Sequence, residues 1–553
     1  MTRYLLFVLA IALLAHTSNC ARVVYDWDIG YVTVNRDGYN TRRAVGVNGK
    51  LPIPPMELTV GDTLVLNVHN SLNVTTSVHS HGLFHNGTSY LDGAATVTQC
   101  GIPPNESFTY SYVVEQAGTF WMHGHDHHQN SDGLRTPLIV HEKCEPPFEY
   151  DDEYLFALED WYAEQFDERA QETMDPNKPF PPPHGYGFGI INGYNGNDTK
   201  PISFKPGRTY RLRVVNMAST QWFQFSIQGH KLRVIEADGV YCEPKEVDGL
   251  DMSPAQRYSV LVTAHNSTEY NYRYNATMYA SFIPPAPGLS PRVFMGLVEY
   301  KQGAPVKNMT MDAESFEWVD DLNLNALDQQ EALPVDRSMN FTIGNNPYTN
   351  GLHLDHINNI TYAAPLVPSL YTALSMGDLA TNESVYGPQT HAFVLKHLEV
   401  VEFIIHNPNA LPHPLHLHGH AFQIMGYGPA PPSFPLNSTL ASDRTQQGAP
   451  ARRDTLVIPP YQYITIRFRA DNPGVWLLHC HMDIHFVLGM VMTFVEAPLE
   501  LQKSQQVPVE MFELCWKQGV KTSGNAAGNA GFDLTGLTPS PTIEAHGNQT
   551  VPT

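Results

Sequence analysis

The stretch HCHMDIHFVLGM, residues 479–490, holds a cysteine between two histidines, followed by a third histidine and a methionine. In an extended strand the side chains of residues i and i+2 share one face, and the residue between them points to the other. Cys480 therefore faces away from His479 and His481. A thiolate with two histidines and a weak thioether is the ligand set of a copper electron-transfer site. The stretch predicts a mononuclear copper at Cys480 and a second metal centre at the two flanking imidazoles.

The same H-x-H spacing recurs in three further pairs, each with both imidazoles on one strand face. Chance clustering among 26 histidines could explain one such pair but not all of them. Eight paired imidazoles suit three coppers, and an electron-entry site beside a three-copper cluster is what four-electron reduction of dioxygen to water requires. A copper carrier without turnover would need only the mononuclear ligands or an incomplete cluster. The further pairs are His79–His81, His123–His125 and His416–His418, and His413, Cys480, His485 and Met490 remain for the mononuclear site.

On these motifs the chain resembles the multicopper oxidases of the fungal laccase and ferroxidase group. The resemblance covers essentially the whole mature chain, and its motifs are very specific. They are HSHGLFHNGTSYLDG (79–93), GTFWMHGHDHHQNSDGL (118–134), HPLHLHGHAF (413–422) and residues 479–490, together with RRDTLVIPP (452–460) and RADNPGVW (469–476).

The resemblance implies four coppers per chain and a role for each matching residue. Substrate electrons would enter the type 1 site at His413 and His485 and leave through Cys480, with Met490 as the axial ligand. Because a thioether favours Cu(II) more than Leu or Phe would, we expect a modest oxidant. Dioxygen reduction consumes protons, so Asp92 and Asp483 are expected to deliver them. The type 2 copper would bind to His79 and His416, one type 3 copper to His81, His123 and His481, and the other to His125, His418 and His479.

Short segments that alternate apolar and polar residues predict an all-β fold of sandwiches or Greek-key barrels. GDTLVLNVHN (61–70), GRTYRLRVVN (207–216) and LEVVEFIIHN (398–407) form a weak internal repeat, which fits the three cupredoxin domains that the resemblance implies. The paired histidines occur only in the first and third blocks, so the three-copper cluster should lie between those domains, with the second as a spacer. We predict domains at residues 21–145, 146–302 and 303–517, and a flexible C-terminal tail at 518–553.

The N-terminus predicts secretion. Residues 1–20 contain an early arginine, a short apolar run and small residues before position 21, as in a signal peptide cleaved after Cys20. No other segment is long and apolar enough for a membrane helix, so we expect an extracellular or cell-wall protein without a membrane anchor. Glycosylation is expected at N-x-S/T sequons. They are Asn73, Asn86, Asn105, Asn197, Asn266, Asn275, Asn308, Asn340, Asn359, Asn382, Asn437 and Asn548.

Four cysteines remain when Cys20 and Cys480 are set aside, and an oxidising compartment would join them in two disulfides with three possible connectivities. The resemblance implies the pairs Cys100–Cys515 and Cys144–Cys242. The formal charge of −22 makes nucleic acid and anionic membranes poor partners. We expect a monomer whose partners are dioxygen and a small electron-rich organic donor.

The donor prediction rests on absent carboxylates. Ferroxidases of this group bind Fe(II) with acids beside the type 1 histidines, but the position four residues before His413 is Asn409. The matching segments PFPPPHGYGFG (179–189) and ASFIPPAPGLSPR (280–292) also lack acids. We therefore predict a laccase-like enzyme that oxidises phenolic or naphtholic donors, such as precursors of pigments or secondary metabolites. An extracellular ferroxidase that oxidises Fe(II) to Fe(III) is the alternative.

Overall fold

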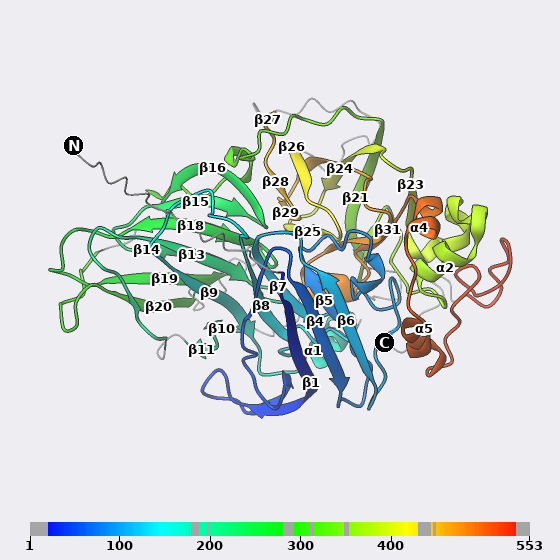
Figure 1. Cartoon of the computed structure of the whole chain (residues 1–553), viewed down its shortest axis with the longest axis horizontal. Coiled ribbons are helices and arrows are strands. Elements are labelled where there is room, and N and C mark those ends of the chain that lie inside the picture. Colours follow the sequence, from blue (N-terminus) through cyan, green and yellow to red (C-terminus); the bar gives the residue numbers. More distant parts are fainter. Residues whose placement is uncertain are drawn as a thin grey trace, which may run out of the picture.

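The computed structural model describes residues 20–175, 177, 187–195, 199–279, 292–309, 315–347, 353–429, 444–445 and 449–537. Strands dominate it, and they form six sheets that pair into three sandwiches in chain order (Figure 1). The predicted all-β class with three sandwich domains is confirmed. The predicted signal peptide lies outside the described residues, except for the exposed Cys20.

The first sandwich packs one four-stranded sheet on another. Apolar and polar residues alternate along its strands. In Ser107–Val113, Phe108, Tyr110 and Tyr112 face the core, while the residues between them are exposed. One sheet has the order β2-β1-β4-β6 and the other β3-β8-β7-β5. The bounds are β1 Arg22–Val34, β2 Arg42–Val47, β3 Met56–Thr59, β4 Thr63–Asn70, β5 Val78–His81, β6 Ser107–Val113, β7 Gly118–Gly124 and β8 Arg135–His141.

The second sandwich is built from the sheets β11-β10-β9-β13-β18-β15-β16 and β12-β20-β19-β14-β17. One helix, α1 (Phe166–Met174), follows its first strand. The strands are β9 Asp152–Trp161, β10 Phe188–Ile191, β11 Tyr194–Asn195, β12 Ile202–Ser203, β13 Thr209–Asn216, β14 Trp222–Ile227, β15 Leu232–Ala237, β16 Val240–Val247, β17 Leu250–Met252, β18 Arg257–Thr263, β19 Tyr272–Tyr279 and β20 Arg292–Glu299.

The third sandwich has the sheets β22-β21-β24-β30-β26-β27, with β28 also paired to β26, and β23-β32-β31-β25-β29. Helices α2 (Ser369–Ser375), α4 (Pro498–Ser504) and α5 (Val509–Trp516) gather at its outer side (Figure 1), and α3 (Asp483–Val487) follows β31. The strands are β21 Arg337–Pro347, β22 His353–Ile357, β23 Ala392–Leu395, β24 Val400–Asn407, β25 His413–Leu417, β26 Phe422–Pro429, β27 Arg444–Thr445, β28 Arg452–Arg453, β29 Thr455–Ile458, β30 Gln462–Arg469, β31 Gly474–Cys480 and β32 Val491–Glu496.

The weak sequence repeat corresponds to a repeated place in the fold. The three similar segments form β4, β13 and β24. Each pairs in parallel with the first long strand of its domain and antiparallel with a later strand. The repeat therefore marks the strand at the centre of each main sheet.

The prediction of a flexible tail is wrong for residues 518–537. Asn525 and Ala526 are buried. The Ala526 N–H donates to the Val385 carbonyl (2.7 Å), and the Ala526 carbonyl accepts from the Leu366 N–H (2.9 Å). The Gly- and Asn-rich composition supplies tight turns rather than disorder, because the chain folds back on the loops around α2. Residues 538–553 of the predicted tail lie outside the described residues.

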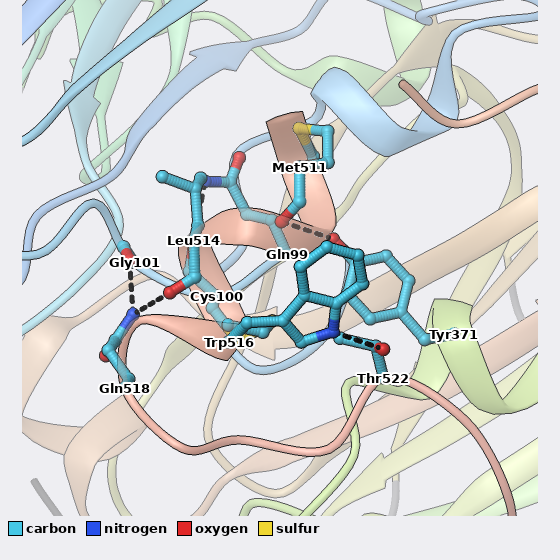
Figure 2. Close-up of a disulfide and its surroundings, with 10 residues drawn as sticks. Gln99, Cys100, Gly101, Tyr371, Met511, Leu514, Trp516, Gln518 and Thr522 are labelled. Atoms are coloured by element: carbon cyan, nitrogen blue, oxygen red, sulfur yellow. Dashed lines mark hydrogen bonds between the residues drawn. A yellow bond between two sulfur atoms is a disulfide. The ribbon is translucent and has the colours of Figure 1, made fainter. Parts of the chain in front are cut away.

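One disulfide, Cys100–Cys515, joins the first domain to α5, as the resemblance implied. Figure 2 shows Gln518 beside it, where its side-chain amide donates to the carbonyls of Gly101 and Leu514 (2.8 Å each). The Cys144–Cys242 pairing is not formed. Cys144 is exposed, whereas Cys242 packs inside the core of the second domain, and both thiols are free.

Nine of the twelve sequons lie on described residues, and one of these nine asparagines is buried. Asn275 is buried within β19, which leaves no room for a glycan, while the other eight are exposed. Asn197, Asn437 and Asn548 lie outside the described residues. Among the helices that the structure describes, none is long and apolar enough to cross a membrane.

Candidate copper centres

Two pairs of strands from different domains bring the histidine pairs together. In the first domain β5 and β7 place His79 opposite His123. In the third domain β25 and β31 place His416 opposite His479 and Leu415 opposite Cys480. Because facing residues share a sheet face, the imidazoles of β31 and β25 point one way and the thiol points the other. This is the alternation predicted from the HCH motif.

The eight paired imidazoles converge between these strands. Nitrogen atoms of His125, His418 and His479 all lie within 4.8 Å of one another, as do those of His79, His416 and His418. The rings of His81, His123 and His481 have centroids 4.9–5.8 Å apart. The first and third domains thus contribute four histidines each, as predicted.

Two properties of these imidazoles suit metal binding: they are uncharged at neutral pH, and several of their ring nitrogens have no described hydrogen-bond partner. Burial lowers the pKa of His81, His123, His418, His479 and His481 well below the ordinary value, so the rings are neutral at pH 7. Metal ligation needs the neutral imidazole. Buried nitrogens of this set lack any hydrogen-bond partner among the described residues, an arrangement that is costly unless a ligand binds them. They are Nε2 of His79, His123 and His416, Nδ1 of His81, and both ring nitrogens of His481.

The mononuclear set lies on the opposite face of β31. The Cys480 sulfur is 3.4 Å from Nδ1 of His485 and 3.8 Å from Nδ1 of His413, and all three side chains are buried. Burial raises the pKa of the Cys480 thiol well above its ordinary value, so a metal ion is needed to hold the thiolate. Met490 is fully buried, and its carbonyl accepts from the Cys480 N–H (3.1 Å). Its axial role stays a prediction.

Asp92 and Asp483, the predicted proton donors, occupy different environments. The Asp92 carboxylate accepts from Nδ1 of His418 (2.9 Å), and its backbone carbonyl is 2.7 Å from Nδ1 of His79. Although burial alone would raise the pKa of Asp92, these imidazoles hold it well below its usual value. Asp92 is therefore an ionised group that orients two ligands.

Asp483 is a buried acid that lines a cavity reaching the cluster. The cavity, of about 160 Å³, is also bordered by His123, His125, His479 and His481. Burial raises the pKa of Asp483 to about 7, although the hydroxyl of Ser131 and the amide of Asn130 donate hydrogen bonds to it. An acid with this pKa can hold a proton at neutral pH, which fits proton delivery.

Sequence reasoning missed Asp454 and Arg257. Asp454 lies 3.3 Å from Nε2 of His81 and 3.5 Å from Nδ1 of His416. Arg257, on β18 of the second domain, donates to both of its carboxylate oxygens (2.8 and 2.6 Å). The second domain is thus more than a spacer. The motif RRDTLVIPP contains Asp454, but 197 residues separate the partners, and no sequence spacing connects them.

Comparisons with known proteins agree with this arrangement. The family description "Multicopper oxidase" matches residues 28–145, 152–289 and 362–500. The iron transport multicopper oxidase fetC of Epichloe festucae is 38% identical over 531 residues, covering 94% of this chain and 84% of the relative. The iron transport multicopper oxidase fio1 of Schizosaccharomyces pombe is 39% identical over 541 residues, covering 94% and 83%.

Two solved structures are also similar to this chain over most of its length. Fet3p, described as a multicopper oxidase that functions in iron import, superposes with a TM-score of 0.85 at 33% identity, covering 94% of this chain and 99% of Fet3p. The laccase from Botrytis aclada has a TM-score of 0.75 at 27% identity, with 90% of each chain covered.

The chain belongs to the multicopper oxidases, with the three cupredoxin-like domains of that family. It is a copper-dependent oxidoreductase that uses dioxygen as electron acceptor and binds four coppers, one of type 1, one of type 2 and a binuclear type 3 pair.

The prediction that its donor is phenolic or naphtholic is wrong, because relatives over nearly the whole chain are named iron transport multicopper oxidases, and Fet3p is described as functioning in iron import. That prediction relied too heavily on the absence of acids at Asn409 and in the segments 179–189 and 280–292. Substrate loops vary more than the scaffold that carries them, and most of the two acid-free segments lies outside the described residues.

Proposed function

We propose that this protein is a secreted ferroxidase that oxidises Fe(II) to Fe(III) and passes the electrons to dioxygen. The observation that carries the proposal is the whole-chain similarity to iron transport oxidases, at 38–39% identity for fetC and fio1. Among the superposed structures, Fet3p is 33% identical and the laccase 27%. The sequons and the N-terminal apolar run favour action outside the cell.

The geometry supports the predicted division of the ligands. His413, Cys480 and His485 would hold the type 1 copper, which supplies one-electron transfer. Leu415 and Cys480 are cross-strand partners next to the pair His416 and His479. Cys480, which would carry electrons onward from the type 1 copper, lies one residue along the backbone from His479 and His481, so electrons would cross only this strand to reach the cluster.

The remaining ligands would follow the pattern expected from the family. His79 and His416 would hold the type 2 copper. His81, His123 and His481 would hold one type 3 copper, and His125, His418 and His479 the other. Asp483 would give protons from the cavity side, while Asp92 fixes the orientation of His79 and His418.

A direct kinetic comparison tests the function. The copper-loaded protein is given Fe(II), 2,6-dimethoxyphenol and a dihydroxynaphthalene in turn, and kcat/KM is measured for each. A ferroxidase should show the highest kcat/KM for Fe(II) by at least about tenfold, since specific iron binding is worth more than about 1.4 kcal/mol. A higher kcat/KM for either organic donor would refute the proposal.

A further inference from the structure

A cavity of about 680 Å³ opens where the three domains meet, and none of the candidate ligand histidines lines it. The first domain contributes Phe84 and Gln116 to its lining, and the second contributes residues 239–241. The third contributes β26, β28, β30 and the segment that connects it to the second domain. Nothing in the copper chemistry described above uses this space.

Strand register gathers arginines on one wall of this interdomain cavity. Gln423 on β26 is the cross-strand partner of Arg452 on β28 and of Arg467 on β30. Direct cross-strand partners share a sheet face, so the three side chains form a row. Arg469 lies two residues after Arg467 and therefore projects from the same face. All four residues line the cavity.

Two arginines of this row are already paired, and the third is not. Arg452 pairs with Asp328 (2.5 Å) and donates to the side-chain oxygen of Gln330. Arg467 pairs with Glu402 (2.7 Å) and donates to the Leu333 carbonyl (3.1 Å). The half-buried Arg469 has no side-chain hydrogen bond or ion pair among the residues that the structure describes. Nε of Arg452 is likewise buried without a described acceptor.

Most other polar groups on the lining are already bonded or exposed. The Gln423 amide bonds to the backbone of Leu333 and Glu331. His420 is 3.0 Å from the buried Glu496. Besides Asp328, the acid on the lining is Asp471, which is exposed. The buried Oδ1 of Asn472 is an acceptor without a described partner, beside the guanidinium donors of Arg469 and Arg452.

We infer that this interdomain cavity binds a small organic polyanion through Arg469 and the adjacent arginine row. Guanidinium groups match carboxylate and phosphate oxygens in bidentate geometry. The cavity volume lies in the range that small organic ligands fill, and it is far larger than a single inorganic ion needs. Because the net charge of −22 opposes the approach of anions to the whole molecule, binding has to come from local contacts with these arginines.

A bound anion would also contact elements of all three domains. Any ligand that binds only the folded state stabilises it, and this one would stabilise the domain arrangement in particular. We therefore expect the midpoint of thermal unfolding to rise with anion concentration.

The test uses isothermal titration calorimetry on the copper-loaded full chain. The probes are propane-1,2,3-tricarboxylate and 2-phosphoglycerate, at constant ionic strength set with sodium chloride, and glycerol is the uncharged control. The variants are Arg469→Gln, Arg469→Lys and, as a matched control, Arg273→Gln, which removes a half-buried strand arginine outside the cavity.

Wild type should bind at least one anion with a Kd below about 10 mM, and the anion that binds identifies the carboxylate or the phosphate class. Arg469→Gln should weaken binding by about tenfold or more, Arg469→Lys by less, and Arg273→Gln not at all. Fe(II) oxidation without added anion should be unchanged in Arg469→Gln. The inference is overturned if neither anion binds, if glycerol binds equally well, or if Arg469→Gln binds as tightly as wild type.

Discussion

At the scale of single residues, the two acids near the cluster differ because their neighbours differ. Two imidazoles hold Asp92 ionised, whereas burial keeps a proton on Asp483 near neutral pH. A carboxylate that is fixed by two ligands orients them, and an acid that lines a cavity can transfer a proton. We therefore propose that this residue type serves two purposes in one site, orienting ligands at Asp92 and delivering protons at Asp483.

Replacing Asp483 with Asn should slow reoxidation of the reduced enzyme by dioxygen by about 10²-fold, the usual contribution of a general acid. Reduction by Fe(II) should be unaffected, because that half-reaction consumes no proton. Stopped-flow spectroscopy separates the two steps. Asp126→Asn, a partly exposed acid on the same cavity, is the control. Normal reoxidation in Asp483→Asn would assign this acid a structural role.

The substrate side offers a second test at Asn409. Its backbone is held by Asn407 and Tyr461, while its side-chain Nδ2 is buried without a described partner. Asn409→Asp would place a carboxylate four residues before His413, and Fe(II) prefers such oxygen ligands. We expect kcat/KM for Fe(II) to rise by about tenfold and that for 2,6-dimethoxyphenol to change less. An equal change for both donors would show that Asn409 does not face the iron.

At the scale of secondary-structure elements, buried ion pairs join strands of the second domain to the other two domains, and one of them reaches the candidate copper ligands. β18 carries Arg257 to Asp454, and β9 carries Glu159 to Arg36 and Arg135 of the first domain. Buried charges of this kind are strongly destabilising when one partner is removed. The strands therefore fix how the domains meet.

Arg257→Lys should lower copper occupancy of the three-copper cluster, at the type 2 position held by His416 and at the type 3 position held by His81. A lysine cannot bond both oxygens of Asp454, so His81 and His416 would lose their common support. Loss of such a supporting contact typically weakens metal binding by about 10–100-fold. Copper stoichiometry and the type 2 electron paramagnetic resonance signal measure this directly. If both stay at wild-type values, the ion pair serves only to join the domains.

Glu159→Gln should destabilise the protein in a pH-dependent way. The guanidinium groups of Arg36 and Arg135 overcome burial and lower the pKa of Glu159 to about 2. The ionised Glu159 carboxylate contributes about 3 kcal/mol to the free energy of unfolding for such a shift. This contribution is complete above pH 4.5 and is lost as the pH falls through 2. The thermal midpoint of Glu159→Gln should therefore lie below wild type at pH 7, and the two should converge toward pH 2. Glu153→Gln, a more exposed acid on β9, should cost much less.

At the scale of the whole molecule, the C-terminal segment is bonded to the first domain. The Cys100–Cys515 bond spans 415 residues. Lys517 also pairs with Glu106 of the first domain (2.7 Å). The first and third domains, which share the copper cluster, are thus joined a second time on their outer side.

Removing this disulfide with Cys100→Ala and Cys515→Ala together should lower stability by about 2–5 kcal/mol. Cross-linking so distant a pair restricts the unfolded chain, and its loss should loosen the contact between the two cluster-bearing domains. Differential scanning calorimetry gives the effect, with Cys144→Ser as a control that should be neutral because this thiol is exposed and unbonded. An unchanged transition in the double variant would mean that α5 is held by packing alone.

The sequence by itself determined what depends on local spacing. The H-x-H pairs and Cys480 fix which side chains share a strand face, because that alternation follows from backbone geometry. The family, the all-β class and the convergence of eight histidines followed from those motifs. Donor identity did not follow, because the missing acids at Asn409 and in two loop segments pointed to organic donors, whereas whole-chain similarity points to iron.

Only the tertiary structure decided which distant residues meet. The pairing of Arg257 with Asp454, the burial of Cys242 away from Cys144 and the packing of residues 518–537 all depend on how domains and strands dock. The different charge states of Asp92 and Asp483 and the arginine row of the interdomain cavity have the same origin. Burial and electrostatic contact are properties of three-dimensional neighbours, and residues far apart in sequence become neighbours only when the chain folds.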